Sequence, residues 1–138
     1  MPVVTDFVTL STHGNAEIVD ITDQVSQKLK AAKIKNGIVT VSVAGSTAAV
    51  TTCEYEPGLV TDIKDIFDKL IPAGQYQHDK TWGDGNGHAH LRASLVGPSV
   101  AIPFQDRALL LGTWQQIIVI DFDNRARKRK IILQFVGE

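Results

Sequence analysis

Residues 100–136 read VAIPFQDRALLLGTWQQIIVIDFDNRARKRKIILQFV, and this stretch decides the fold class. Four of its segments alternate apolar with polar residues or run apolar between turn signals: 100–104, 108–111, 116–122 and 131–136. Each is predicted to be a strand, because side chains along a strand alternate between the two faces of a sheet. A C-terminal third made of strands alone favours an α+β chain with a mostly antiparallel sheet.

Toward the N-terminus, β-branched or alternating segments predict four more strands. They span residues 3–10, 16–20, 38–44 and 48–54. The second is expected to pair with the first as a hairpin across His13-Gly14-Asn15. Apolar residues recur every three or four positions from Ile21 to Ala32, which predicts a helix over residues 22–33.

A second helix is predicted after the break at Pro57-Gly58. Its apolar stripe is Leu59, Ile63, Ile66, Phe67 and Leu70. Pro72 ends it, since proline removes a backbone donor and clashes within a helix. The order of elements then predicts a single α+β domain over residues 1–138 with two helices.

Composition excludes several classes of protein. The 138 residues carry a net charge of −1, so bulk charge gives no reason to expect a nucleic-acid or anionic-membrane partner. A single cysteine excludes an internal disulfide framework. No apolar run approaches the roughly 18 residues of a membrane span, and residues 1–10 do not resemble a signal peptide. We therefore expect a soluble cytoplasmic protein without a membrane partner.

Residues 73–89 lack apolar periodicity and are predicted to form a long loop. Loops of that length in a compact domain are usually functional or disordered, and the aromatic and imidazole groups here argue against disorder. Three of the four histidines, His78, His88 and His90, fall in this segment or one residue beyond it. This concentration is the main indication of a functional site.

The three histidines suit a metal site. In an extended segment His88 and His90 would point to the same side, and His78 could form a third corner. Neutral imidazole is the commonest ligand of a metal such as zinc, and three protein ligands with one open position describe a catalytic site. Asp79 and Asp84 could serve as oxygen ligands or orient the rings. The alternatives are an anion site, or polar loop residues in ordinary hydrogen bonds.

Two further polar groups have both a functional and a structural interpretation. Glu54 ends a strand before the Pro57 break, where its carboxylate could face a cleft, whereas Asp62 and Asp65 share a helix face and could simply be solvated. Residues 125–130 hold five basic residues among six. They could capture phosphate through arginine, or form a solvated turn and a charged edge strand.

Two motifs resemble those of the YjbQ-like family. They are residues 93–103, ASLVGPSVAIP, and residues 111–115, LGTWQ. Tyr76-Gln77-His78-Asp79, Ala89-His90-Leu91 and Arg129-Lys130 also fit, so the resemblance covers nearly the whole chain.

The resemblance implies a β-sandwich-like sheet with two helices, assembled as a homotrimer. It also implies a weak thiamine-phosphate synthase activity, which joins a pyrimidine diphosphate to a thiazole phosphate, and a bound divalent metal such as zinc or magnesium. The resemblance assigns catalysis to Glu54, Asp62 and Gln115, and substrate or phosphate binding to Thr113, Trp114 and Arg129. His78 and His90 are the implied metal ligands, and His88 is added by the spacing argument above.

The sequence departs from the family pattern at two places. Gly45-Ser46-Thr47 stands where relatives typically have His-Thr-Ser or His-Thr-Thr, so a histidine is missing at Gly45. Arg107-Ala108 replaces the usual Gly-Arg, which shifts an arginine by one position. Such a shift would change its face in a strand, although a turn could absorb it.

Two hypotheses of function follow. The first is an enzyme acting on a small phosphorylated molecule, in which a cation and arginine neutralise the departing pyrophosphate. The second is a non-catalytic metal- or anion-binding protein, which the missing histidine at Gly45 favours. A nucleic-acid contact through the basic run is the weakest interpretation, because nothing else in the composition supports it.

Overall fold

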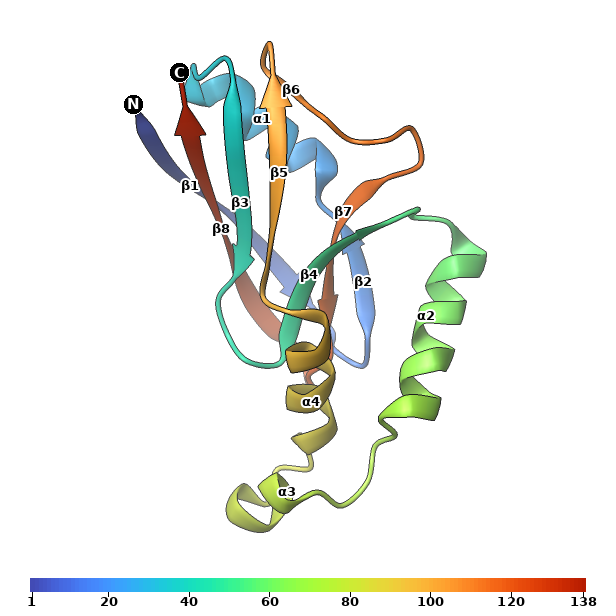
Figure 1. Cartoon of the computed structure of the whole chain (residues 1–138). Coiled ribbons are helices and arrows are strands. Elements are labelled where there is room, and N and C mark those ends of the chain that lie inside the picture. The colour runs from blue at the N-terminus through green and yellow to red at the C-terminus, as the bar shows by residue number, and fades with distance from the viewer.

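The computed structural model describes all 138 residues and contains eight strands and four helices (Figure 1). The strands are β1 (Val3–Thr12), β2 (Glu17–Asp20), β3 (Gly37–Val43), β4 (Ala48–Cys53), β5 (Ser99–Gln105), β6 (Ala108–Leu109), β7 (Gln116–Asp121) and β8 (Arg127–Gly137). The helices are α1 (Thr22–Ala32), α2 (Pro57–Leu70), α3 (Gln77–Trp82) and α4 (Gly87–Val96). No helix has the length and apolar character that a bilayer span requires.

The strands form two antiparallel sheets. The larger sheet has the order β1-β8-β3-β5-β6, and the smaller has the order β2-β7-β4. The α+β fold with a sandwich-like arrangement of antiparallel sheets is therefore confirmed. β2 pairs with β7 in the smaller sheet, so the prediction that it forms a hairpin with β1 is wrong.

Two apolar clusters hold these layers together. The larger one contains 17 buried residues and joins the inner faces of the two sheets to α1, through residues such as Val25, Val41, Val119 and Leu133. The smaller one, with 9 buried residues, lies between the other face of the β2-β7-β4 sheet and helices α2 and α4. The smaller sheet is thus covered on both faces, which explains why β7 is almost continuously apolar.

No charged residue belongs to the first three residue rows on the outer face of the large sheet, although the ammonium of Lys130, from the next row, lies 4.0 Å from the centroid of the Phe7 ring. Strand register aligns Val3, Val136, Ile38 and Pro103 in one row, Thr5, Gln134, Thr40 and Ala101 in the next, and Phe7, Ile132, Ser42 and Ser99 in the third. We call these twelve residues the outer sheet face. Val3 and Ile38 are at least half exposed, and no helix packs on them.

Residues 73–89 were predicted to be a loop, and this prediction is wrong. The segment contains α3 and the start of α4, so the chain has four helices instead of two. α3 is a short helix whose start is capped by Tyr76 and Asp79. α4 packs against the sheet through its own small alanines, Ala89 and Ala93, and has no broad apolar stripe. Both helices therefore lack the periodic apolar signal on which the prediction depended.

The C-terminal basic run was predicted, in one interpretation, to lie at a sheet edge. β8 begins at Arg127, and its residues 127–130 pair with β1 alone, because β3 pairs with β8 only from Ile131 onward. The basic part of β8 therefore has a partner strand on one side only, as the edge interpretation expected. Alternate residues of the run point in opposite directions, so Lys128 and Lys130 are exposed while Arg129 is buried.

Candidate functional site

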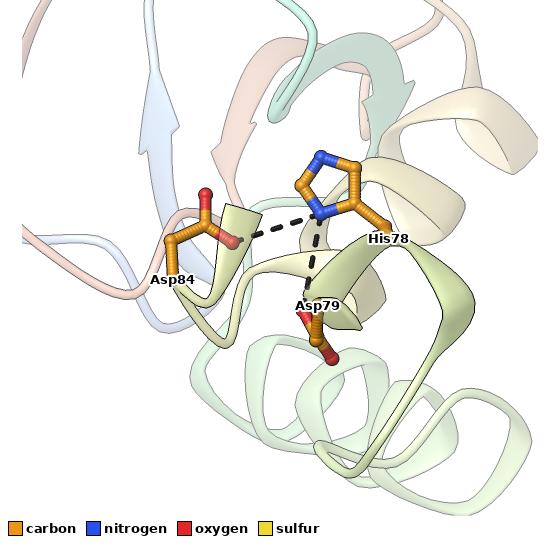
Figure 2. A group of neighbouring side chains, drawn as sticks. All are labelled: His78, Asp79 and Asp84. Atoms are coloured by element: carbon orange, nitrogen blue, oxygen red, sulfur yellow. Dashed lines mark ion pairs between the residues drawn. The ribbon is translucent and has the colours of Figure 1, made fainter. Parts of the chain in front are cut away.

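His78, Asp79 and Asp84 come together where α3 turns back toward α4 (Figure 2). The Nδ1 atom of His78 lies 3.6 Å from Oδ1 of Asp84 and 3.8 Å from Oδ1 of Asp79. Both separations are too long for a hydrogen bond, and this buried nitrogen has no other partner in the chain. Two atoms that each bind one tetrahedral ion at about 2.1 Å lie about 3.4 Å apart. The observed separations are close to this value, so the three groups could be ligands of a shared cation.

Local hydrogen bonds fix Asp79 in this arrangement. Its Oδ2 accepts from the Tyr76 N–H at 3.0 Å, and its Oδ1 accepts from the Gly87 N–H at 2.9 Å. The N–H of Tyr76, more than any other group, lowers the pKa of Asp79 below its usual value, so this carboxylate stays ionised at neutral pH. Asp79 therefore connects the start of α3 with the start of α4.

Two glycines in the left-handed conformation reverse the direction of the backbone, and this turn brings Asp84 close to His78. Gly83 and Gly85 have φ angles of 63° and 65°, a region that other residues rarely adopt. Asp84 itself accepts a hydrogen bond from the Asn86 N–H at 3.3 Å. The Gly-rich segment that the sequence marked as a loop thus serves to place one carboxylate.

His90 lies beside this group, but His88 does not share its face of the helix. The ring centroids of His78 and His90 are 4.3 Å apart. His88 and His90 are both in α4, where residues two apart point in nearly opposite directions. The predicted convergence of His88 with His90 is wrong, because it assumed an extended segment.

His88 is buried instead of facing the hollow beside His78. Burial, together with the nearby charge of Arg92, lowers its pKa below 6.5, and its Nδ1 atom has no hydrogen-bond partner. A hollow of about 280 Å³ opens on the other side of the helix start and is lined by Tyr76, Gln77, His78, Gly87, His90 and Leu91. A ligand entering it would meet the imidazoles of His78 and His90.

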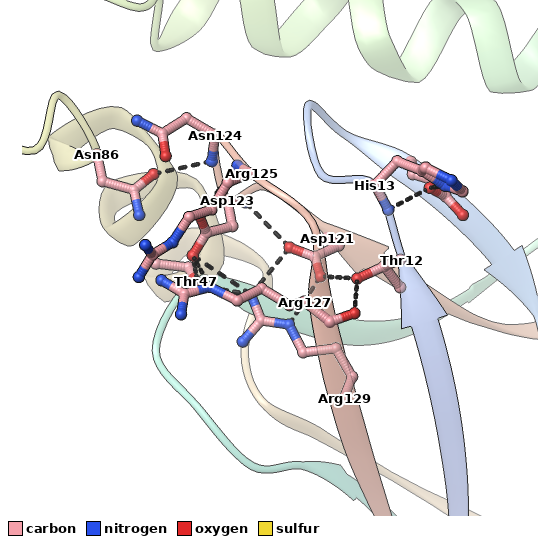
Figure 3. Close-up of polar contacts among 11 residues, drawn as sticks. Thr12, His13, Thr47, Asn86, Asp121, Asp123, Asn124, Arg125, Arg127 and Arg129 are labelled. Atoms are coloured by element: carbon pink, nitrogen blue, oxygen red, sulfur yellow. Dashed lines mark hydrogen bonds and ion pairs between the residues drawn. The ribbon is translucent and has the colours of Figure 1, made fainter.

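Arg129 lies in a second, buried polar network (Figure 3). Its Nε and Nη2 atoms donate to the two carboxylate oxygens of Asp121 at 2.7 and 2.9 Å, and Nη2 also donates to the Thr47 hydroxyl. Thr12 donates to Asp121 as well, at 2.5 Å. Arg129 was predicted to bind phosphate. In the structure, most of its N–H groups already donate hydrogen bonds to other residues of the chain.

Asp123 extends this network to the turn before β8. It accepts hydrogen bonds from Thr47 and from the guanidinium of Arg127. The adjacent Asn124 bonds to the segment that carries Asp84: its N–H donates to the Asn86 side chain and its amide donates to the Asp84 carbonyl. Asp121, Asp123 and Asn86 were missed from sequence. The only signal of the two aspartates was their place at the end of an apolar run, and that of Asn86 was its place in the Gly-rich segment.

The remaining predicted site residues lie around a different hollow. Glu54, Thr113 and Trp114 line a space of about 400 Å³, together with Asp20, Tyr55, Glu56, Pro57 and Gln116. Gln115 is next to it and donates to the Thr52 hydroxyl at 3.1 Å. This hollow shares no lining residue with the one beside His78. Asp62 is an exposed residue of α2 and lines neither.

The two departures from the family pattern have structural explanations. Gly45 has a φ of 115°, and a Cβ atom there would lie 2.8 Å from Nη1 of Arg129, so this backbone does not accommodate a histidine. Arg107 is the second of two left-handed residues in the turn between β5 and β6, and it is exposed. The shifted arginine therefore falls in a turn, which absorbs the change of register.

Comparison with known proteins identifies relatives over nearly the full length. Residues 6–138 match the model of the family described as "UPF0047 protein YjbQ-like". A UPF0047 protein of Archaeoglobus fulgidus is 40% identical over 126 residues, which are 91% of this chain and 96% of the relative. The crystal structure of a YbjQ-like protein of unknown function from Sulfolobus solfataricus superposes with a TM-score of 0.93 at 36% identity, over 99% of both chains. A hypothetical protein of Aeropyrum pernix gives 0.90 at 35% identity, over 98% of this chain and 99% of that one.

Proposed function

Since this chain belongs to the UPF0047 family of YjbQ-like proteins, we propose that it binds a divalent cation and, through it, a small phosphorylated molecule. One observation carries the proposal. The buried Nδ1 atom of His78 has no hydrogen-bond partner, yet it lies at ligand spacing from the carboxylates of Asp79 and Asp84. A buried polar atom without a partner is rare in folded proteins, and a cation would supply the missing interaction.

The donor set favours zinc over magnesium. One imidazole with two carboxylates, and a second imidazole next to the first, is a nitrogen–oxygen set that zinc accepts in a tetrahedral arrangement. Magnesium prefers six oxygen ligands and keeps several waters. Asp79 and Asp84 would hold the ion together with His78, while His90 faces the adjacent hollow.

A bound cation would supply positive charge for phosphate oxygens in the hollow beside His78. The residues of this chain would do the rest. Tyr76 and Leu91 provide apolar walls for a small molecule, and His90 offers a ring nitrogen to a polar group. Asp79 holds its place through two backbone N–H groups, so the site is preorganised before a ligand arrives.

Thiamine-phosphate synthase activity is the finer proposal that the resemblance suggests. In support, Gln115 is held in a defined orientation, because its side chain bonds to the Gly112 N–H and the Thr52 hydroxyl beside Glu54. The two hollows of one chain are separate, however. Glu54 and Gln115 would therefore reach His78 and His90 only if they came from another subunit. The cation-binding function needs no such assembly, and the geometry of a single chain supports it best.

The homotrimer is likewise proposed. The outer sheet face supports self-association, because its rows from Val3 to Thr5 contain no charged residue and can be buried against another copy, with the ammonium of Lys130 over Phe7 at the border of the contact.

Metal content tests the proposed function. We expect elemental analysis of tag-free protein loaded with zinc to give close to one ion per chain. The His78→Ala, His90→Ala double variant and Asp84→Asn should lose it. Asp65→Asn changes an exposed helical carboxylate that belongs neither to this group nor to the lining of the hollow, and it is the matched control. Wild-type protein that stays free of metal after zinc loading would contradict the proposal.

Turnover tests the finer proposal separately. Zinc-loaded protein is mixed with hydroxymethylpyrimidine diphosphate and thiazole phosphate, and thiamine phosphate is quantified. Product formation that is lost in a Glu54→Ala, His90→Ala variant would support the enzyme. Equal rates in both proteins, or no product from either, would leave a binding protein.

A further inference from the structure

The loop between β3 and β4 presents unused backbone donors. The N–H groups of Gly45, Ser46 and Thr47 make no hydrogen bond to any backbone or side-chain acceptor of the chain. Gly45 and Ser46 are exposed, whereas Thr47 is only 6% exposed, and buried backbone N–H groups are almost always paired. Successive N–H groups without acceptors in the chain are the kind of donor from which anion-binding backbone nests are built.

One nitrogen of the Arg129 guanidinium lies against the same loop. Nε and Nη2 of Arg129 donate hydrogen bonds to Asp121 and Thr47, whereas Nη1 makes no hydrogen bond. Nη1 lies 2.8 Å from the position that a Cβ atom at Gly45 would occupy. A side chain at position 45 would therefore cover this donor, and the glycine leaves it accessible from the loop.

A hollow of about 200 Å³ adjoins these donors. Gly45, Ser46, Ala48, Ala93, Ser94 and Pro98 line it, so the loop forms one wall and α4 forms the other. Ser94 donates its hydroxyl to the His90 carbonyl one helical turn earlier. Ser94 and His90 are thus neighbours on one face of α4, about 6 Å apart along the axis.

We propose that the Gly45-Ser46-Thr47 loop and Nη1 of Arg129 form a binding site for a small oxyanion, of which a phosphate group is the best fit. The backbone N–H groups supply directed donors, and the guanidinium supplies a charge-assisted one. The carboxylates of Asp121 and Asp123 lie on the Nε and Nη2 side of Arg129 and balance the charges of Arg129 and Arg127. The local charge is therefore near neutral, and the hydrogen-bond geometry decides the affinity.

The inference deepens the proposed function but can fail independently of it. If the molecule held by the cation carries phosphate, His90 and Ser94 place the two hollows one helical turn apart, which a phosphorylated ring compound can span. That step rests on the proposed function. The oxyanion site itself does not, because none of its donors is a ligand of the proposed cation.

The test uses inorganic phosphate in the presence of a chelator, so that no metal contributes. Backbone amide signals of ¹⁵N-labelled protein are followed by NMR during a titration with sodium phosphate, against sodium chloride at matched ionic strength. We expect the amides of Gly45, Ser46 and Thr47 and the Arg129 guanidinium to shift with one common saturation curve. Shifts that chloride reproduces, or that appear only at Lys128 and Lys130, would overturn the proposal.

Two variants and one control define the site further. Gly45→Ala covers Nη1, and Ser94→Leu fills the hollow from the helix side, so each should weaken phosphate binding about tenfold or more. Thr61→Leu is the matched control, since Thr61 is also an exposed helical residue whose hydroxyl bonds to the carbonyl four residues earlier. Circular dichroism establishes that each variant is folded. Ser94→Leu protein that is folded and binds phosphate like the Thr61→Leu control would refute the site, even where zinc binds normally.

Discussion

Arg129 forms a bidentate ion pair with Asp121, with Nε 2.7 Å from Oδ2 and Nη2 2.9 Å from Oδ1. Asp121 is completely buried and Arg129 is 6% exposed, so both charged groups are largely desolvated. Such a pair is costly to break from one side, because the remaining charge stays buried without a partner.

Removing Arg129 should therefore destabilise the fold. We expect Arg129→Met to lower the free energy of unfolding by about 3–5 kcal/mol in denaturant titrations. Lys28→Met breaks the partly exposed pair with Asp6 and should cost less than about 1 kcal/mol. Similar losses in both variants would show that the buried pair is worth no more than a surface pair.

The same network should make stability fall in acid. Burial raises the pKa of Asp121, but hydrogen bonds from Arg129, Thr12 and the Asp123 N–H outweigh it, and the net pKa lies below 3.8. Burial also raises the pKa of Asp123, and bonds involving Thr47, Asn86 and Arg127 outweigh it in the same way. A lowered folded-state pKa gives stability that is complete above the unfolded-state pKa near 3.8 and is lost as pH falls through the folded-state pKa.

Unfolding free energies at pH 7, 5 and 3 measure this effect. We expect little loss of stability between pH 7 and 5 from these two groups, and a steep loss from about pH 4 downward. Asp121→Asn should be less stable at pH 7 and should lose less on acidification, since that position no longer takes up a proton. Equal slopes for the two proteins would contradict the assignment to Asp121.

A histidine at position 45 should not fit this backbone. Gly45 has a φ of 115°, and a Cβ atom would lie 2.8 Å from Nη1 of Arg129. We expect Gly45→His to lower stability by about 1–3 kcal/mol, the cost of holding a side chain in a disfavoured conformation. Thermal unfolding checks this against Gly74→His, at a glycine whose added Cβ would touch nothing closer than 4.0 Å. Unchanged stability in Gly45→His would mean that the loop reorganises freely.

Asn124 should control cation affinity without touching the cation. Its side chain donates to the Asp84 carbonyl at 2.8 Å, and its N–H donates to Asn86. We expect Asn124→Ala to weaken zinc binding severalfold, because loss of an orienting hydrogen bond beyond the ligands typically reduces metal affinity. Titration calorimetry with zinc compares it with Asn36→Ala, an exposed asparagine at the opposite end of the fold. Equal zinc affinity in the two variants would exclude a positioning role.

The outer sheet face should mediate self-association. Ile38 and Val136 face each other across β3 and β8 and are both exposed. If copies meet on this face, an Ile38→Lys change buries an unpaired charge in the contact, and we expect the assembly to dissociate into monomers. Light scattering coupled to size-exclusion chromatography measures the mass. Leu70→Lys, at an exposed leucine of α2, is the control and should leave the mass unchanged.

Sequence reasoning was accurate where a single short-range pattern decides the structure. The alternation of residues 38–44 and the apolar run of 116–122 correspond to β3 and β7, and the stripe of Leu59 and Ile63 corresponds to α2. It failed at α3 and α4. There, helix formation depends on the capping contacts of Tyr76 and Asp79 and on the packing of Ala89 and Ala93, none of which produces a periodic apolar pattern.

The sequence by itself determined the fold class, the single domain and the family, because alternating strands, amphipathic helices and the LGTWQ motif are visible in the order of residues. Only the tertiary structure decided which polar groups meet. Arg129 and Asp121 are eight residues apart but belong to different sheets, and Asp84 reaches His78 only through two left-handed glycines. Strand order is set by the packing of the whole chain, so no local pattern could place the contact of Arg129 with Asp121 in advance. The nearness of Asp79 and Asp84 to His78 was expected from the sequence, and the structure added their spacing.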